Sequence, residues 1–222
     1  MSLLSQQFGS QMVNLGSALL LLTCFAIVAQ RRLSACVDLF ALQSVLLAAT
    51  AALVAFLTGI HHIYIAAALT VVIKAVLIPR ILKQVVERLN VTRELVMNVN
   101  VPASLLICGG LVMLAFFITQ PIIPLGFLLT RDSLAIALAI ILIGFFTMIA
   151  RKKAVTQVIG FLVMENGLFL GATSAAYGMP LIVEIGVFFD VLVGALIIGI
   201  YTHRLQDAFD SVDTTKLTTL KE

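Results

Sequence analysis

Seven apolar stretches of about 20 residues each dominate this chain of 222 residues. Because a helix rises 1.5 Å per residue, about 20 residues span the hydrocarbon core of a bilayer, whereas membrane strands are about half as long and alternate in polarity. Only 11% of the residues are charged and 61% are apolar, with a mean hydropathy of +1.15. That is too little charge to cover a water-soluble surface. The sequence predicts an all-α polytopic membrane protein with helices over residues 8–29, 34–58, 62–79, 101–119, 132–150, 154–176 and 179–202.

The basic residues indicate how these helices are oriented. With seven spans, 12 of the 14 Lys and Arg residues fall on one side, while Arg131 falls on the other and Lys74 lies within a span. Cytoplasmic loops are enriched in Lys and Arg, so we expect the N-terminus outside and the C-terminus in the cytoplasm. The residues on the basic side are Arg31, Arg32, Arg80, Lys83, Arg88, Arg93, Arg151, Lys152, Lys153, Arg204, Lys216 and Lys221.

The order of basic and polar residues predicts a parallel three-helix repeat. Arg31-Arg32 precede a span with Gln43-Ser44, as Arg151-Lys152 precede a span with Glu165-Asn166. In the connection between the units, apolar residues recur at helical spacing, which predicts an amphipathic helix on the inner membrane surface or under a partner. The expected divisions are an N-terminal unit at 1–79, a connection with one linking helix at 80–131, a C-terminal unit at 132–204 and a cytoplasmic tail at 205–222.

Two acidic residues, Glu165 and Asp190, lie near the middle of predicted spans. Glu165 is 12 residues beyond Lys153, and Asp190 is 13 residues before His203 on the next span, so both acids should lie at nearly the same depth. Glu184 lies closer to the outer face. A carboxylate in hydrocarbon is costly unless it is paired, protonated or hydrated. These acids therefore either form a polar track for protons or bond neighbouring helices and only lock their packing.

A second charged pair is expected in the N-terminal unit. Asp38 lies near the cytoplasmic end of the second span, and Lys74 lies six residues before Arg80, at the cytoplasmic end of the third. Because their expected depths match, we predict an ion pair between adjacent helices. Such a pair either relays protons by joining and separating, or only lowers the cost of placing two charges in the membrane.

The sequence carries no recognisable catalytic motif. It has no glycine-rich phosphate loop, nucleophile elbow or zinc motif, and Cys24, Cys36 and Cys108 lack metal-ligand spacing. The loops outside the spans are too short for a catalytic domain. We therefore expect no active site, metal or cofactor in this chain, and lipid and protein partners rather than nucleic acid.

Four short segments are distinctive enough to compare with known families. Residues 157–167 read QVIGFLVMENG and residues 181–190 read LIVEIGVFFD, and both resemble hydrogenase-4 component E. KAVLIP at 74–79 and LTTLK at 217–221 extend this resemblance over almost the whole chain. The last three spans, about 132–204, are also similar to the small three-helix subunit of respiratory complex I and of multisubunit cation/proton antiporters.

The resemblance implies a multi-pass membrane subunit of a group 4 NiFe hydrogenase, such as a formate hydrogenlyase, in the prokaryotic cytoplasmic membrane. It implies antiporter-like neighbours and a peripheral arm that carries the NiFe centre and Fe-S clusters. In the complex I subunit, two mid-membrane glutamates belong to the proton pathway. Asp190 occupies the place of the second, whereas the first aligns with Leu162, one helical turn before Glu165. The residues expected to take part in proton translocation or charge relay are Glu165, Asp190, Glu184, Lys74 and Asp38.

Two other functions stay open at this point. The chain is either a subunit of a cation/proton antiporter without redox partners, or a structural bridge whose buried acids only pack helices. Neighbouring subunits separate the antiporter from the hydrogenase, and neutral substitution of Glu165 or Asp190 separates the structural bridge from both.

Overall fold

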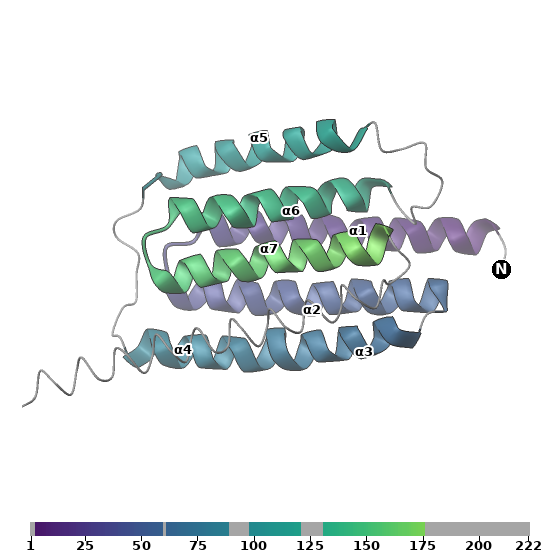
Figure 1. Cartoon of the computed structure of the whole chain (residues 1–222), viewed down its shortest axis with the longest axis horizontal. Coiled ribbons are helices and arrows are strands. Elements are labelled where there is room, and N and C mark those ends of the chain that lie inside the picture. The colour runs from purple at the N-terminus through teal and green to yellow at the C-terminus, as the bar shows by residue number, and fades with distance from the viewer. Residues whose placement is uncertain (1–2, 60, 89–97, 121–130, 176–222) are drawn as a thin grey trace, which may run out of the picture.

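The computed structural model of the chain describes residues 3–59, 61–88, 98–120 and 131–175 (Figure 1). Nearly all of this part is helical, and six stretches are long and apolar enough to cross a membrane. Six predicted spans are thereby confirmed, and the seventh, 179–202, lies outside the described residues. The elements are α1 (Leu3–Ala29), α2 (Leu33–Thr58), α3 (His61–Thr70), a π-helical segment η1 (Val71–Leu77), α4 (Ile78–Arg88), α5 (Val101–Thr119), α6 (Arg131–Ala150) and α7 (Ala154–Ala175).

The third span is longer than the sequence indicated. Instead of ending near Arg80, the helix continues through α4 to Arg88, so that α3, η1 and α4 form one rod (Figure 1). Its last part has the expected amphipathic pattern, because Leu82 and Val85 are buried while Glu87 is exposed. This apolar side packs against α2 rather than turning away from the bundle. The first residues of the predicted surface helix therefore belong to the third span.

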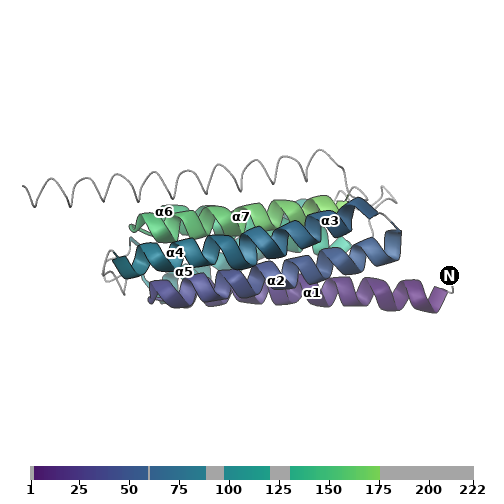
Figure 2. The ribbon, with the colours of Figure 1, turned by 90° about the horizontal axis from the view of Figure 1, so that it is seen from below.

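Helix α2 contacts α1, α3, η1, α4 and α7, and so connects the first hairpin to the rest of the described bundle (Figure 2). Its C-terminus is closed by Gly59, whose left-handed backbone (φ 71°) favours glycine and whose N–H donates to the Ala55 carbonyl. This turn leads the chain back along α2 as α3. A residue with a side chain would hold this conformation at a cost.

The hairpins α1–α2 and α6–α7 run in the same sense. Ser17, in the middle of α1, donates to Ser133 at the start of α6, while Arg151, just after α6, donates to the Val28 carbonyl near the end of α1. Because each hairpin is antiparallel, α2 and α7 are then also parallel. This is the arrangement expected for the first two helices of each predicted unit. The repeat itself stays a prediction, since the third span of the second unit lies outside the described residues.

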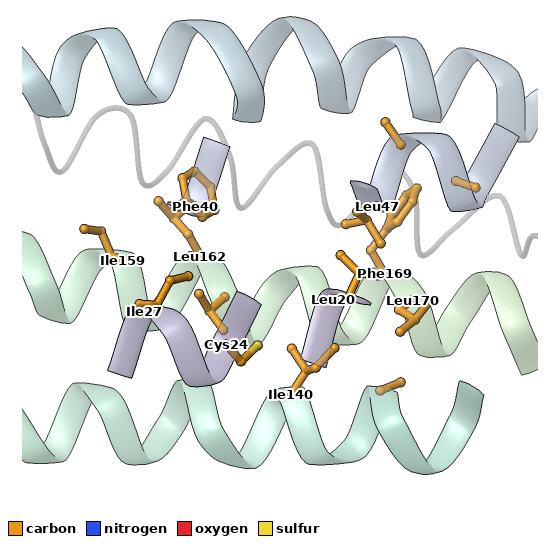
Figure 3. Close-up of a cluster of buried hydrophobic side chains, with 14 of the residues drawn as sticks. Leu20, Cys24, Ile27, Phe40, Leu47, Ile140, Ile159, Leu162, Phe169 and Leu170 are labelled. Carbon is orange, nitrogen blue, oxygen red and sulfur yellow. The ribbon is translucent and has the colours of Figure 1, made fainter. Parts of the chain in front are cut away.

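The apolar core lies where these two hairpins meet (Figure 3). Leucine, isoleucine and phenylalanine side chains from α1, α2, α6 and α7 converge there, and most are almost completely buried. Packing of this kind, with interhelical hydrogen bonds, is what holds helices together in a membrane. The side chains labelled in the figure are Leu20, Cys24, Ile27, Phe40, Leu47, Ile140, Ile159, Leu162, Phe169 and Leu170.

Arg151 joins the two hairpins at their basic end. Its side chain is only 5% exposed, and Nη2 donates to the carbonyls of Val28 (2.6 Å) and Gln30 (3.0 Å), just where α1 ends. A cation at this position satisfies carbonyls that no helical N–H reaches and interacts favourably with the helix dipole. The sequence marked Arg151 only as a loop cation, because burial by another helix is not visible in a local pattern.

Glycines bring α6 and α7 into backbone contact. A Cβ atom at Gly144 would lie 2.6 Å from the Met164 nitrogen and 2.7 Å from the Gly160 carbonyl oxygen. A Cβ at Gly160 would lie 3.0 Å from the Gly144 carbonyl oxygen. Small residues of this kind allow membrane helices to approach closely and gain dispersion energy. This close contact positions α7, which carries the residues described next.

We expect Gly144→Ala to destabilise the protein, because the new methyl group meets backbone atoms that cannot rotate away. Overpacking of this kind typically costs about 1–3 kcal/mol. Gly110→Ala on α5 is the matched control, since no atom lies within 4 Å of its added Cβ. Thermal unfolding in mild detergent should show a lower Tm for Gly144→Ala alone. Equal Tm values for the two variants would contradict the proposed helix contact.

Candidate functional site

The centre of the bundle contains a buried ion pair between Lys74 and Glu165. The Lys74 Nζ lies 2.9 Å from the Glu165 Oε1, and each side chain is only 4% exposed. The lysine comes from η1 and the glutamate from the middle of α7. Single charges at this depth are strongly disfavoured, so the two groups depend on each other. The part of α7 predicted to lie at mid-membrane therefore faces a cation.

Two amide side chains extend this pair toward α1. Asn166 accepts a hydrogen bond from the Lys74 Nζ at 3.4 Å and donates its own Nδ2 to the Gln43 Oε1 at 3.2 Å. Gln43 donates in turn to the Leu20 carbonyl at 3.2 Å and to the Cys24 Sγ at 2.9 Å. Both amides are buried. A continuous polar chain thus links η1, α7, α2 and α1 through an otherwise apolar core.

The π-helical segment η1 places Lys74 within the third span. Its wide turn is closed by a hydrogen bond from the Ile78 N–H to the carbonyl of Ile73, five residues back. The next residue, Pro79, has no N–H to offer the preceding turn, and β-branched residues before it are less favourable in an α-helix. Both features weaken the regular helical pattern here. π-Helical turns are rare and occur often at functional sites.

The predicted ion pair between Lys74 and Asp38 is wrong. Asp38 is exposed and instead pairs with Lys83 on α4, with an Oδ1–Nζ distance of 2.5 Å. The sequence placed the end of the third span near Arg80, whereas the helix continues to Arg88. Lys83, nine residues beyond Lys74, therefore reaches the level of Asp38. Those nine residues correspond to about 14 Å along the helix axis.

The remaining predicted pathway residues, Glu184 and Asp190, lie outside the described residues. Their roles and their depth relative to Glu165 stay predictions. Within the part of the chain that the structure describes, no group of three or more His, Cys, Asp and Glu residues is close enough together to hold a metal ion.

Sequence reasoning missed Gln43 and Asn166 as functional candidates. The sequence showed both residues only as parts of the Gln43-Ser44 and Glu165-Asn166 pairs, which indicated a similarity between the two predicted units. A polar amide near mid-span is itself a signal, because it needs a hydrogen-bond partner in hydrocarbon. Which amide meets which becomes visible only when the helices are packed together.

Known proteins resemble this chain over almost its whole length. An uncharacterised protein of Mycobacterium tuberculosis is 37% identical over 218 residues, covering 96% of this chain and 97% of that protein. Hydrogenase-4 component E of Escherichia coli strain K12 is 25% identical over 217 residues, covering 96% of this chain and 99% of that protein. The protein of the same name from Shigella flexneri matches with the same identity and coverage.

The chain is therefore similar to hydrogenase-4 component E over almost its whole length. The resemblance indicated by the segments around Glu165 and Glu184 is thereby confirmed. No protein-family model matches the chain, and no solved structure matches it. The likeness of the last three spans to the small complex I subunit stays a prediction. Within the part of the chain that the structure describes, the buried polar chain around Lys74 is the strongest candidate for a functional site.

We expect Lys74→Met and Glu165→Gln to destabilise the protein more as single variants than as a double variant. Removing one partner of a buried pair leaves the other charge uncompensated, which costs about 3–5 kcal/mol, whereas removing both leaves no charge. The free energy of unfolding in mixed detergent micelles, measured for both singles and the double, gives the coupling energy.

The exposed pair between Lys83 and Asp38 is the matched control for this cycle. Its side chains are 45% and 59% exposed, so water screens both charges. Exposed pairs contribute about 0–1 kcal/mol. If the Lys74–Glu165 cycle gave a coupling as small as the Lys83–Asp38 cycle, the buried pair would not be a stabilising ion pair.

Proposed function

We propose that this chain is a membrane subunit of a NiFe hydrogenase complex of the hydrogenase-4 or formate hydrogenlyase type, and that its Lys74–Glu165 pair takes part in proton translocation. The observation that carries this proposal is an ion pair of two titratable side chains buried in the middle of the bundle, in a chain that resembles hydrogenase-4 component E over 96% of its length. A pair that served only to hold helices together would not require groups that exchange protons.

The pair can move a proton without creating net charge. Transfer from the Lys74 Nζ to the Glu165 Oε1, now 2.9 Å apart, breaks one N–H bond and forms one O–H bond. An ammonium and a carboxylate become a neutral amine and a carboxylic acid. The site is neutral overall before and after the transfer, so neither state places an unbalanced charge in the membrane. If the ammonium instead moves away, the carboxylate needs another proton or another cation.

The proposed route continues through the last predicted span. Asp190, expected at the depth of Glu165 on a neighbouring antiparallel helix, would exchange protons with it, and Glu184 would lead toward the outer face. On the cytoplasmic side, the exposed Asp38 near the start of α2 is the proposed entrance. This route crosses the membrane with the carboxyl groups and lysine as its titratable steps.

The rest of the complex would supply the redox chemistry. The chain would lie in the cytoplasmic membrane of a prokaryotic cell, with its N-terminus outside and its C-terminus in the cytoplasm. Antiporter-like membrane subunits would contact it, and a peripheral arm would carry the NiFe centre and Fe-S clusters. This chain would hold no cofactor of its own, and would respond to electron transfer through shifts of charge in its neighbours.

We expect Glu165→Gln to lower the number of protons translocated per electron pair by at least tenfold while the complex still assembles, because glutamine keeps the shape but cannot exchange a proton. Asp190→Asn should have the same effect. Proton uptake by liposomes that contain the whole complex measures this ratio. Glu87→Gln, which changes an exposed glutamate on α4, is the control and should keep the wild-type ratio. Full coupling in both test variants would refute a proton pathway through these acids.

Purification of the complex in mild detergent tests the partners. Mass spectrometry should detect the hydrogenase subunits together with antiporter-like membrane subunits. Recovery of antiporter subunits alone would favour ion exchange without redox partners, and would overturn the hydrogenase assignment.

A further inference from the structure

The hydrogen bonds that lead from α1 to Lys74 can run in only one direction. They begin at the Leu20 carbonyl, which is an acceptor and has no proton to donate. Gln43 must therefore direct its Nε2 toward Leu20, at 3.2 Å, and its Oε1 away from α1. The orientation of this first amide is thus fixed by a backbone atom.

The orientation of the second amide follows from the first. The Gln43 Oε1 can only accept, so it receives the Asn166 Nδ2 at 3.2 Å. Asn166 then has its Oδ1 left to face the Lys74 Nζ at 3.4 Å, and the ammonium can only donate. Each of the two amides accepts from one neighbour and donates to the next. If either amide were turned over, two donors or two acceptors would face each other at a buried site, which costs free energy.

We propose that Gln43 and Asn166 are positioning residues that aim the Lys74 ammonium at Glu165. The acceptor oxygen that faces Lys74 is the Asn166 Oδ1, which Gln43 orients from α2, while the neighbouring residue Glu165 presents its carboxylate from the same helix, α7. Lys74 has a long, flexible side chain, and proton transfer depends on holding its Nζ within hydrogen-bond distance of the carboxylate. Primary amides suit this role, because they form hydrogen bonds but do not titrate. This inference rests on the proposed function of the Lys74–Glu165 pair.

The local environment explains why both amides are needed. Neither Gln43 nor Asn166 is more than 2% exposed, and each takes part in hydrogen bonds to a different helix. Ser44, the neighbour of Gln43, is equally buried but donates only to the Phe40 carbonyl of its own helix. The buried Ser44 hydroxyl therefore finds its hydrogen-bond partner within its own helix, whereas the buried Gln43 amide finds its partners on other helices.

The test compares variants of the whole complex in liposomes by protons translocated per electron pair. Gln43→Leu and Asn166→Leu should each lower this ratio at least threefold while electron transfer in the complex is unchanged. Ser44→Ala should keep the wild-type ratio. Wild-type coupling in both leucine variants would overturn the inference.

An exchange of the two amides separates positioning from folding. Gln43→Asn shortens the chain by one methylene and Asn166→Gln lengthens it by one, so each single variant should be impaired while the double exchange restores the total reach. Recovery of coupling in the double variant is expected even if the leucine variants fail to assemble. A double variant no better than the worse single one would overturn the inference.

The Glu165→Gln variant distinguishes this inference from the proposed function. If Glu165→Gln abolishes coupling while the amide variants do not, only the positioning role fails. If Glu165→Gln remains fully coupled, the proposed function of the pair fails, and the positioning role fails with it.

Discussion

An ammonium group and a carboxylate buried in the same apolar bundle have to meet, and much of this structure depends on the contact between Lys74 and Glu165. The pair ties the third span to α7, while Asn166 and Gln43 carry the connection on to α2 and α1. Close packing at Gly144 and Gly160 holds α7 against α6 and so fixes where its carboxylate points. Apolar contacts alone would allow the helices to slide or rotate at small cost, whereas this polar chain has one arrangement in which every donor meets an acceptor.

The unusual backbone of η1 belongs to the same arrangement. A wide helical turn next to Pro79 changes which side of the rod faces the bundle, so the residues before and after Lys74 need not follow a single regular stripe. Below the turn, α4 directs Leu82 and Val85 toward α2 and leaves Lys83 to meet Asp38 near the surface. One rod therefore carries a buried lysine and an exposed lysine that serve different partners.

The sequence predicts those features that depend on local composition. Apolar length located six spans, of which the third was predicted too short at its C-terminal end, and the rarity of a mid-span acid led to Glu165. Predictions from the sequence were wrong or missing for contacts that depend on which helix packs against which. The pairing of Lys74 with Asp38 was estimated from depth alone, and that depth assumed a helix end near Arg80. Three contacts join residues that are more than a hundred positions apart or on different helices, so no local pattern contains them. They are the hydrogen bond between Gln43 and Asn166, the burial of Arg151 and the contact of Gly144 with α7.

The parallel course of the two hairpins has a consequence for how such a site can be built. Two identical subunits placed around a two-fold axis would present the same side chain from both sides, so that a glutamine would meet a glutamine and an acid an acid. Here one covalent chain supplies both sides, and Gln43 on one hairpin meets Asn166 on the other, beside Glu165, whose counterpart in the predicted repeat is the uncharged Gln43. Because both halves belong to a single polypeptide, two different side chains can meet at the centre of the bundle. The hydrogen bonds there can then all point the same way, from Lys74 toward α1, which a contact on a two-fold axis does not allow.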